Sequence, residues 1–568
     1  MERIWLKSYP KGVDSEVDVD SLGTIIDVFD RSVERFRHHK GFTSVNTVQT
    51  YGQTKEKVDL FSSFLQNELK IKKGDRIAVM LPNCLQYPIV VLGALQIGAV
   101  IVNVNPLYTA PELVHQLVDA EPTTIVIIEN FAKTLEKALP EIPTLKNIIL
   151  TSIGDQLHSF WGYLLNFVVR YIQKGVPSYK LPSNTIKFND ALKLGKKKSY
   201  IKVDIKNTDL AFLQYTGGTT GVAKGAMLTH RNICANMAQA QEWLKPYNFK
   251  LGGEIAMSPL PLYHIFSLTC NMMIFLNLGG QNILIANPMD TKMFIRQMRK
   301  YRISGLTAVN TLFNSLLSNP EFQKVDFSSW ILCLGGGAAI QKDVADKWLK
   351  VTGLPIIEAY GLTEASPGVA VNPLMDTDDM KQKGWTGSVG LPLPGTDISL
   401  RDDNNNEVVL GESGELWIKG PQVMQGYWKQ PEETAKVLKD GWLRTGDIAT
   451  MDEDGYLRIV DRKKDLVVIS GFNVYPNEVE DVVTLHPDIV ECAVIGVPHP
   501  KTGEALKVFV VTSNPKLTGE EITKFCRQYL TGYKVPKIFE FRDQLPKSLV
   551  GKILRKELRD EELKRCNS

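Results

Sequence analysis

A short loop rich in glycine and threonine carries the residue types that bind phosphate. It runs from Tyr215 to Gly225 and holds four glycines, three threonines and one lysine within eleven residues. Glycine permits a positive φ and a close approach of the backbone to a ligand, so successive N–H groups can converge on an anion. Threonine hydroxyls add short donors, and lysine adds a mobile positive charge. The pattern predicts a polyphosphate site at Thr216, Gly217, Gly218, Thr219, Thr220 and Lys224.

The stretches on either side of this loop predict two strands and a helix. Residues 209–214 form an apolar run short enough for a buried strand, and a second short strand follows at 226–229. Thr229 is placed to cap a helix that begins near Arg231. Because Lys224 precedes a glycine and then a strand, the loop is not a Walker A loop, which needs Gly-Lys-Ser/Thr opening a helix. A flexible surface hairpin is the alternative for so many turn residues.

Two downstream segments offer the parts of an acyl pocket and of a nucleotide pocket. His264 precedes an apolar helix at 268–278, in which leucine, Met272, Met273 and Phe275 would make an adaptable wall for a fatty chain. Taken alone, that helix is typical of ordinary core. Residues 330–339 form a strand that ends in a glycine turn, where main-chain atoms can lie close to a flat ring. Residues 358–364 then bring an aromatic ring, a hydroxyl and a carboxylate together.

Three charged positions nearer the C-terminus complete the set. Asp447 follows a Thr–Gly turn, where its carboxylate could accept both hydroxyls of a ribose or could form an Asx turn. Residues 461–465 are a compact charged run between two strands, which predicts a domain boundary with a hinge. Lys552 follows a glycine and precedes an apolar–basic helix, so it can project from a tight turn.

Taken in this order, the motifs resemble those of the adenylate-forming enzymes, the family of acyl-CoA synthetases, luciferases and the adenylation modules of peptide synthetases. The resemblance spans nearly the whole chain, and residues 440–480 are similar to the signature of the subgroup that acts on long-chain fatty acids. It implies a large N-terminal domain of α/β layers with a β-rich subdomain at 1–460. A hinge at 461–465 and a smaller, mobile α+β domain at 466–568 would follow, with the site in the cleft between the two domains.

The resemblance also implies a role for each motif residue. The loop residues would bind the phosphates of ATP, and Thr216 and Glu364 would hold Mg²⁺, which needs few protein carboxylates when phosphates supply oxygens. Asp447 would bind the ribose, and Arg462, Lys464 and Gly471 would serve the hinge and the channel for the coenzyme A thiol arm. The adenine pocket would comprise Gly336, Gly337, Ala338, Tyr360 and Gly361. The catalytic residues would be Lys552, Thr363, Glu364 and His264.

The implied reaction is the activation of a long-chain fatty acid to acyl-CoA through acyl-AMP, with release of AMP and pyrophosphate. The substrates would be the fatty acid, ATP and coenzyme A. The alternatives are another acid such as an aryl or medium-chain one, transfer of the acyl group to a carrier protein, and a lipid-binding or transport protein with no activity. The last would not need Glu364, Asp447 and Lys552. Lys501, Lys507, Lys534 and Lys537 are basic candidates for binding the nucleotide of coenzyme A, although surface lysines are commonly just solvated.

Bulk properties bound the remaining expectations. The 568 residues exceed what one core usually supports, so at least two domains are expected. The net charge of +3 gives no sign of nucleic acid binding. The seven cysteines form no Cys-x-x-Cys pair, and the N-terminus lacks an apolar signal region, so a cytoplasmic enzyme is expected. Residues 159–174 could form an interfacial helix at the inner membrane or pack on their own domain. The sequence is compatible with a homodimer and does not decide the oligomeric state.

Overall fold

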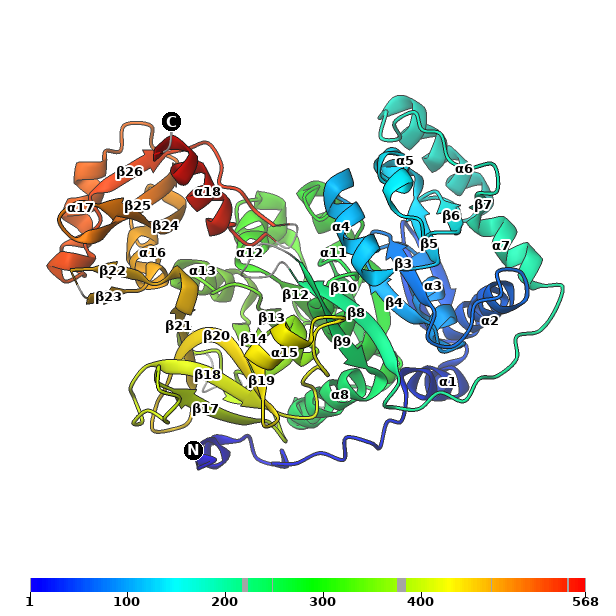
Figure 1. Cartoon of the computed structure of the whole chain (residues 1–568), viewed down its shortest axis with the longest axis horizontal. Helices are drawn as coiled ribbons and strands as arrows, with labels where there is room; N and C mark the ends of the chain where they lie inside the picture. The colour runs from blue at the N-terminus through cyan, green and yellow to red at the C-terminus, as the bar shows by residue number, and fades with distance from the viewer. Residues whose placement is uncertain are drawn as a thin grey trace.

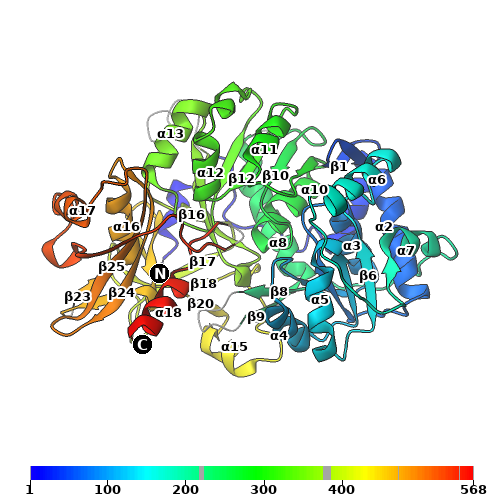
Figure 2. The same ribbon diagram turned by 90° about the horizontal axis from the view of Figure 1, so that it is seen from above.

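The computed structural model describes residues 2–216, 223–247, 249–374, 385–470, 472–548 and 551–566. Within these residues the strands form four sheets. Three of the sheets build a large body, and the fourth builds a smaller body at the C-terminus, as Figures 1 and 2 show. The predicted site residues Gly217, Gly218, Thr219, Thr220 and Gly471 lie outside the described residues.

The first sheet carries the strand that leads into the phosphate loop. Its seven strands lie in the order β7-β6-β5-β3-β4-β8-β9. β3 pairs in parallel with β4 and with β5, because a helix crosses over between successive strands. The alternation of strands and helices predicted from residue 76 is therefore confirmed. The strands are β3 (Arg76–Met80), β4 (Val100–Asn103), β5 (Thr124–Ile128), β6 (Asn147–Thr151), β7 (Ile186–Lys187), β8 (Leu210–Thr216) and β9 (Lys224–Thr229).

The second sheet carries the glycine turn and the Tyr360 motif. Its nine strands lie in the order β16-β15-β14-β13-β12-β10-β11-β1-β2. Neighbouring strands from β1 to β14 are parallel, so their carboxyl ends lie along one edge, where open α/β sheets bind ligands. The strands are β1 (Lys40–Ser44), β2 (Thr47–Thr50), β10 (Ile255–Ser258), β11 (Gln281–Leu284), β12 (Gly305–Ala308), β13 (Leu332–Gly335), β14 (Ile356–Gly361), β15 (Gly368–Val371) and β16 (Leu391–Pro392).

Two smaller sheets follow in the chain. The third is an antiparallel β-rich layer of the large body, and the fourth has its own buried core in the C-terminal body. The third sheet contains β17 (Asp397–Arg401), β18 (Gly414–Lys419), β19 (Leu438–Lys439), β20 (Trp442–Met451) and β21 (Leu457–Arg462). The fourth contains β22 (Val467–Ile469), β23 (Phe472–Val474), β24 (Ile489–His499), β25 (Gly503–Thr512) and β26 (Ile538–Phe541).

Some of the helices that cover these sheets begin at a capping side chain. Thr229 caps α8 as predicted, since its side chain accepts a hydrogen bond from the N–H of Asn232. Within the described part of the chain, every helix is too short or too polar to span a lipid bilayer. The longer helices are α1 (Ile25–Phe36), α2 (Tyr51–Asn67), α3 (Gln86–Leu95), α4 (Ala110–Ala120), α5 (Ala132–Ala138), α6 (Ser159–Phe167), α7 (Phe188–Gly195), α8 (His230–Leu244), α11 (Thr291–Met298), α12 (Asn310–Leu317), α13 (Lys342–Thr352), α15 (Pro431–Val437), α16 (Pro476–Thr484), α17 (Gly519–Cys526) and α18 (Arg555–Cys566).

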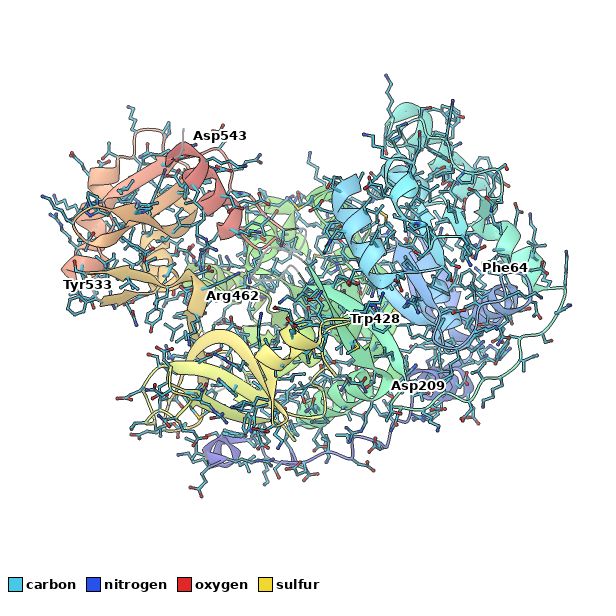
Figure 3. All side chains as sticks on the ribbon, in the orientation of Figure 1. Phe64, Asp209, Trp428, Arg462, Tyr533 and Asp543 are labelled. Carbon is cyan, nitrogen blue, oxygen red and sulfur yellow. The ribbon has the colours of Figure 1, made fainter. Side chains whose placement is uncertain are left out.

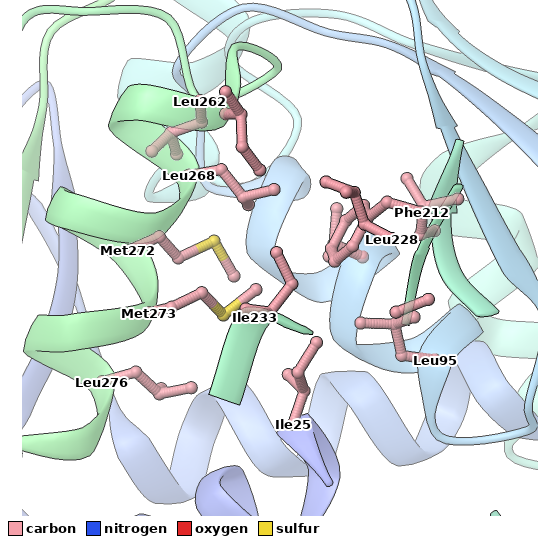
Figure 4. Close-up of a cluster of buried hydrophobic side chains, with 14 of the residues drawn as sticks. Ile25, Leu95, Phe212, Leu228, Ile233, Leu262, Leu268, Met272, Met273 and Leu276 are labelled. Atoms are coloured by element: carbon pink, nitrogen blue, oxygen red, sulfur yellow. The ribbon is translucent and has the colours of Figure 1, made fainter. Parts of the chain in front are cut away.

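The side chains of the apolar helix predicted at 268–278 lie in two different environments. It is continuous through α9 (Ile265–Ser267), a π-helical stretch at Leu268–Met273 and α10 (Ile274–Asn277). Met272 and Met273 are fully buried in the core of the large body, as Figure 4 shows. The expectation that these two methionines line the acyl channel is therefore wrong. Ile274 and Phe275, from the same helix, line the cleft instead.

Candidate active site

A single large cleft collects most of the predicted site residues that the structure describes. Its volume is about 1620 Å³, and its lining comes from both the large body and the C-terminal body. Pockets for one small ligand usually measure roughly 300–1,000 Å³, so this cleft has room for more than one. The predicted residues in its lining are Thr216, Lys224, His264, Gly336, Gly337, Ala338, Tyr360, Gly361, Thr363, Glu364, Asp447, Arg462, Lys464 and Lys552.

The two strands that flank the predicted phosphate loop end at the cleft. β8 and β9 are antiparallel, and Thr216 pairs with Lys224 at the end of the ladder. The ammonium of Lys224 forms an ion pair with Glu433 of α15 and lies 5.2 Å from the ring centre of Tyr427. Lys224 was predicted to be a mobile charge, but this structure holds it in place. A bound phosphate would compete with Glu433 for the same ammonium.

Small residues lie at the carboxyl end of β13, where this strand runs close to β14. The two strands are parallel, with Gly335 opposite Glu358. A Cβ on Gly336 would lie 3.1 Å from the carbonyl oxygen of Ala359, so a larger residue would push the strands apart. Gly337 has a φ of 76°, which favours glycine. These glycines line the cleft together with Tyr360, and their role toward adenine stays a prediction.

Asp447 is held by two groups that come from different strands. The hydroxyl of Tyr360 donates a hydrogen bond to Oδ2 at 2.6 Å. Arg462 lies opposite on β21, with its Nε 3.3 Å from Oδ1, at the place where the chain leaves the third sheet (Figure 3). Burial and the neighbouring carboxylate raise the pKa of Tyr360, so its phenol stays a donor. The side chain of Asp447 thus makes tertiary contacts and not the predicted alternative of an Asx turn, and its role toward ribose stays a prediction.

Glu364 offers a hard oxygen site for a metal ion. The hydroxyl of Tyr427 donates a hydrogen bond to Oε1 of this carboxylate at 2.8 Å. Burial raises its pKa, an effect that a bound cation would reverse. No cluster of three or more His, Cys, Asp or Glu side chains that could hold a metal occurs among the described residues. One carboxylate with the Thr216 hydroxyl suits Mg²⁺, which takes its other ligands from phosphates and water.

Lys552 lies on a tight turn of the C-terminal body. Gly551 has a φ of 77°, and Ser548 binds the backbone N–H of Lys552 at 3.1 Å. Burial, and then the charge of Arg462, lower the pKa of Lys552 to about 8. The ammonium therefore remains mostly protonated at pH 7 and faces the cleft. Among the described residues, no carboxylate forms an ion pair with it.

His264 lines the same cleft as Lys552. Burial, and then the charge of Lys552, lower the pKa of His264 to about 4. Its Nδ1 accepts a hydrogen bond from the N–H of Phe266 at 3.3 Å. The imidazole is therefore neutral at pH 7 and can orient a substrate but cannot supply a charge. Lys552 is thus close enough to sense both His264 and the Asp447–Arg462 pair.

Apolar side chains line one part of the cleft. α8 contributes Ala240, Trp243 and Leu244 to the lining, and Phe249, Ile274, Phe275 and Leu278 also line the cleft. Trp243 and Phe249 were not predicted from the sequence. One turn of α8 carries Ala240 and Leu244, whose spacing of four puts both on one helix face, but nothing local marks that face as a wall.

A buried arginine fastens the predicted hinge and was also missed. Arg555 donates to Oε1 of Glu480 at 2.9 Å and to Oδ1 of Asp461 at 3.1 Å. Asp461 is 1% exposed, and Asp465 pairs with Arg559 at 2.7 Å. In sequence, Arg555 is one cation in a basic helix. Only the folded chain reveals that it is surrounded by carboxylates.

Two of the lysines considered for the nucleotide of coenzyme A are engaged elsewhere. The ammonium of Lys507 lies 2.8 Å from Glu540 and 2.6 Å from Glu562, and the residue is buried. Lys534 pairs with Glu478 at 2.7 Å. Lys501 and Lys537 are exposed. The first two are therefore poor candidates in this arrangement of the chain.

Similarity to known proteins agrees with this arrangement. The profile of the family described as AMP-binding enzyme matches residues 29–428, and that of the AMP-binding enzyme C-terminal domain matches residues 478–552. The chain belongs to the AMP-binding enzyme family, so the resemblance drawn from the motifs is confirmed.

Relatives and a solved structure extend the match. The chain is 53% identical to a long-chain-fatty-acid–CoA ligase of Yersinia pestis, over 99% of both chains. It is 52% identical to a ligase of the same name from Salmonella typhi, over 99% of this chain and 98% of the relative. A crystal structure of the anthranilate CoA ligase AuaEII with anthranoyl-AMP superposes with a TM-score of 0.83 at 22% identity, over 96% of this chain and 98% of that one. The predicted fold class is therefore confirmed.

Proposed function

We propose that the chain converts long-chain fatty acids to acyl-CoA at the expense of ATP, through an acyl-AMP intermediate, with release of AMP and pyrophosphate. Relatives named for this activity are 52–53% identical over nearly their whole length. The observation that carries the proposal is one continuous cleft. It joins a polar end at Tyr360 and Asp447 to an apolar end at Trp243 and Phe249.

The first step brings two anions together. A carboxylate is a poor acyl donor, because its leaving group would be oxide. A carboxylate oxygen therefore attacks the α-phosphorus of ATP, and the bond from that phosphorus to pyrophosphate breaks. Positive charge fixed in a water-poor site stabilises this transition state, and Lys552 supplies it. Glu364 and Thr216 would hold Mg²⁺ together with the phosphates, and the ion would neutralise further phosphate charge.

The second step has different needs. The thiol sulfur of coenzyme A attacks the acyl carbon, AMP leaves with the bonding electrons, and the thiol proton passes to solvent. Lys552 has no part in it. The proposal therefore includes a large domain at 1–460, a hinge at 461–465 and a mobile domain at 466–568. Rotation at the hinge, next to Arg462 and Lys464, would replace the Lys552 turn with Gly471 and its neighbours.

The partners follow from this chemistry. They are a long-chain fatty acid, ATP, Mg²⁺ and coenzyme A, with no nucleic acid. We place the enzyme in the cytoplasm, because the six cysteines whose side chains the structure describes form no disulfide bond. Peripheral contact with the cytoplasmic face of the inner membrane belongs to the same proposal, since long-chain acids partition into lipid.

ATP–pyrophosphate exchange with a panel of acids tests the substrate. We expect palmitate and oleate to exceed acetate in kcat/KM, because each buried CH₂ contributes about 0.8 kcal/mol. Comparable values for acetate and palmitate would overturn the proposal, and an aryl acid at the top of the panel would reassign the substrate. Thioester formation with coenzyme A, compared with a phosphopantetheine-bearing carrier protein, separates the ligase from an enzyme that loads carriers.

A single substitution tests the acyl wall. Ala240 lines the cleft on α8, and phenylalanine there would fill space that a long chain needs. For Ala240→Phe we expect kcat/KM for palmitate to fall by about tenfold or more relative to octanoate, which corresponds to about 1.4 kcal/mol. Ala238→Phe, on the same helix but outside the lining, is the matched control and should leave the ratio unchanged.

A further inference from the structure

Helix α6 and the π-helical turn at Val168–Ile172 carry their apolar side chains toward solvent. Trp161 is 65% exposed and Tyr163 78% exposed, values far above those of the buried helix α3. Contiguous apolar patches of this kind are rare on soluble proteins and mark interaction sites. We call these side chains the aromatic face. It consists of Phe160, Trp161, Tyr163, Leu164, Phe167, Tyr171 and Ile172.

The polar side of the same helix holds it to the protein. Asn166 accepts a hydrogen bond from the N–H of Gly154 at 2.8 Å and donates one to Asp155 at 3.1 Å. Gly162 packs directly against Gly154, so a Cβ on either glycine would clash with the carbonyl oxygen of the other. Arg170 forms an ion pair with the buried carboxylate of Glu129. These contacts fix the helix with its apolar side outward, so the aromatic face does not pack on its own domain.

The surroundings of the aromatic face are basic. Between Gln156 and Asn189 the chain contains no aspartate and no glutamate. β7 and α7 belong to the same end of the molecule as α6, opposite the C-terminal body (Figures 1 and 2). The phenol of Tyr163 is close enough to contribute, after Asp190, to the raised pKa of Lys193 on α7. The exposed lysines of this part of the chain are Lys174, Lys180, Lys187, Lys193, Lys196, Lys197, Lys198 and Lys202.

We propose that the aromatic face is the surface by which this protein docks on a lipid bilayer that contains anionic lipids. Tryptophan and tyrosine favour the headgroup region, where one edge of the ring stays wet and the rest lies in hydrocarbon. A helix with an apolar side and basic neighbours lies in the plane of that interface. The lysines attract anionic headgroups within a Debye length. This surface would make the membrane contact of the proposed function, and its use to collect fatty acid rests on that function. Its binding to lipid is measured without ligase activity.

A second copy of the chain fits the aromatic face less well than an anionic lipid bilayer does. An isologous contact across a two-fold axis would bring the same surface against itself. Lys174, Lys180 and Lys187 of the two copies would then come close together, and the stretch 156–189 that carries them has no aspartate or glutamate to offset their charge. Anionic lipid supplies the missing negative charge, and its fluid surface adapts to side chains that project from a single helix.

Flotation of the full-length protein with vesicles tests the proposal. The vesicles contain phosphatidylcholine alone or with phosphatidylglycerol, at low and high salt. We expect binding to the mixed vesicles, with weaker binding at high salt. The variant with Phe160→Ser, Trp161→Ser and Phe167→Ser should lose affinity by about tenfold or more. The side chains are exposed, so the melting temperature should not change. Absence of binding by the unmodified protein, or equal binding by the variant, would overturn the proposal.

Matched controls separate the aromatic face from apolar exposure in general. Met289→Ser, Val409→Ser and Leu563→Ser remove three exposed apolar side chains elsewhere and should leave vesicle binding intact. Lys174→Gln with Lys180→Gln should weaken binding to the mixed vesicles and leave any binding to phosphatidylcholine alone unchanged. Sedimentation would detect the other occupant: a dimer that the serine variant converts to a monomer, without vesicle binding, would assign the aromatic face to a second copy.

The fluorescence of Trp161 reports how deeply the aromatic face enters the bilayer. Addition of mixed vesicles should shift part of the tryptophan emission to shorter wavelength, and brominated lipid should quench it. Trp161→Phe keeps a ring at this position, so it should bind vesicles but lose most of the shift. ATP–pyrophosphate exchange with octanoate should be unchanged in all these variants. Loss of ligase activity with intact vesicle binding would therefore refute the proposed function and leave the aromatic face as assigned.

Discussion

The nucleotide pocket and the turn that carries Lys552 are held in different ways. In the pocket the functional side chains bond one another: Tyr360 donates to Asp447, which also pairs with Arg462. Lys552 forms no ion pair with any residue that the structure describes. Its turn touches the large body where the Thr311 hydroxyl donates to the carbonyl of Gly551 at 3.3 Å.

This difference matches the number of steps that each part serves in the proposed reaction. The ribose and adenine of AMP remain bound through both steps, so the groups that hold them can be fixed in advance. The charge at the α-phosphorus is needed once. A strong contact there would slow the release of the lysine, so a weak docking contact suits a group that must be removed.

The largest expected effect comes from removal of the delivered charge. For Lys552→Ala we expect acyl-AMP formation to fall by about 10²–10³ or more, since one preorganised donor contributes roughly 2.7–4 kcal/mol. Thioester formation from supplied acyl-AMP should stay near the unmodified rate. Single-turnover assays of the two half-reactions measure both, and Lys524→Ala, an exposed lysine of α17, is the control. Equal losses in the two half-reactions would refute the division of labour.

A fixed group should behave in the opposite way. Asp447→Asn keeps the shape of the side chain but removes its charge, which weakens the bonds to Arg462 and to a ribose. We expect both half-reactions to slow by a similar factor of about ten, because a hydrogen bond to a charged group is worth about 1–2 kcal/mol more than a neutral one. Rates for ATP and for supplied acyl-AMP check this. A loss confined to adenylation would mean that Asp447, like Lys552, acts only in the first step.

The sequence predicted the local elements of the fold but not their neighbours. Strands β3, β4 and β5 and the helices between them follow from the periodicity of apolar residues, which is a local property. The order of the second sheet is not local, since β1 lies beside β11, more than two hundred residues later. The two-sided environment of residues 268–278 likewise depends on which elements pack there. Met272 and Met273 could therefore not be separated from a channel wall in advance.

The residues of the site likewise differ in whether the local sequence marks them. Tyr360, Glu364, Asp447 and Lys552 stand in short motifs, so each was found from the residues around it. Three contacts around the site were not found, because each joins segments that are distant in sequence: Tyr427 with Glu364, Glu433 with Lys224, and Arg555 with Glu480. A single tyrosine or arginine carries no local signal of the group that it will meet. The exposure of the aromatic face depended in the same way on how α6 docks.

The pH dependence of the two half-reactions distinguishes the role of Lys552 from that of the nucleotide pocket without a mutation. Since the pKa of Lys552 is lowered to about 8, its ammonium is present below that pH and is lost as the pH rises through it. The kcat/KM of adenylation, which reports on the free enzyme, should therefore fall about tenfold per pH unit above 8. Bound polyphosphate favours the ammonium and should move the limb of kcat to higher pH. In Lys552→Arg the limb should disappear, because guanidinium stays protonated. An identical limb in thioester formation would contradict this assignment.

The smallest effect tests the docking contact itself. Thr311→Val keeps the volume of the side chain and removes the hydroxyl that binds the carbonyl of Gly551. A neutral hydrogen bond contributes about 0.5–1.5 kcal/mol, so acyl-AMP formation should slow by roughly two- to tenfold. Thioester formation should be unchanged or slightly faster, because the C-terminal body leaves this position more readily. Ser315→Val, one turn along the same helix α12, controls for the added apolar surface. Rapid-quench measurements of both half-reactions resolve differences of this size. If Thr311→Val slowed both equally, the Thr311 hydroxyl would support the large body itself, and the weak contact between the two parts of the site would have to lie elsewhere.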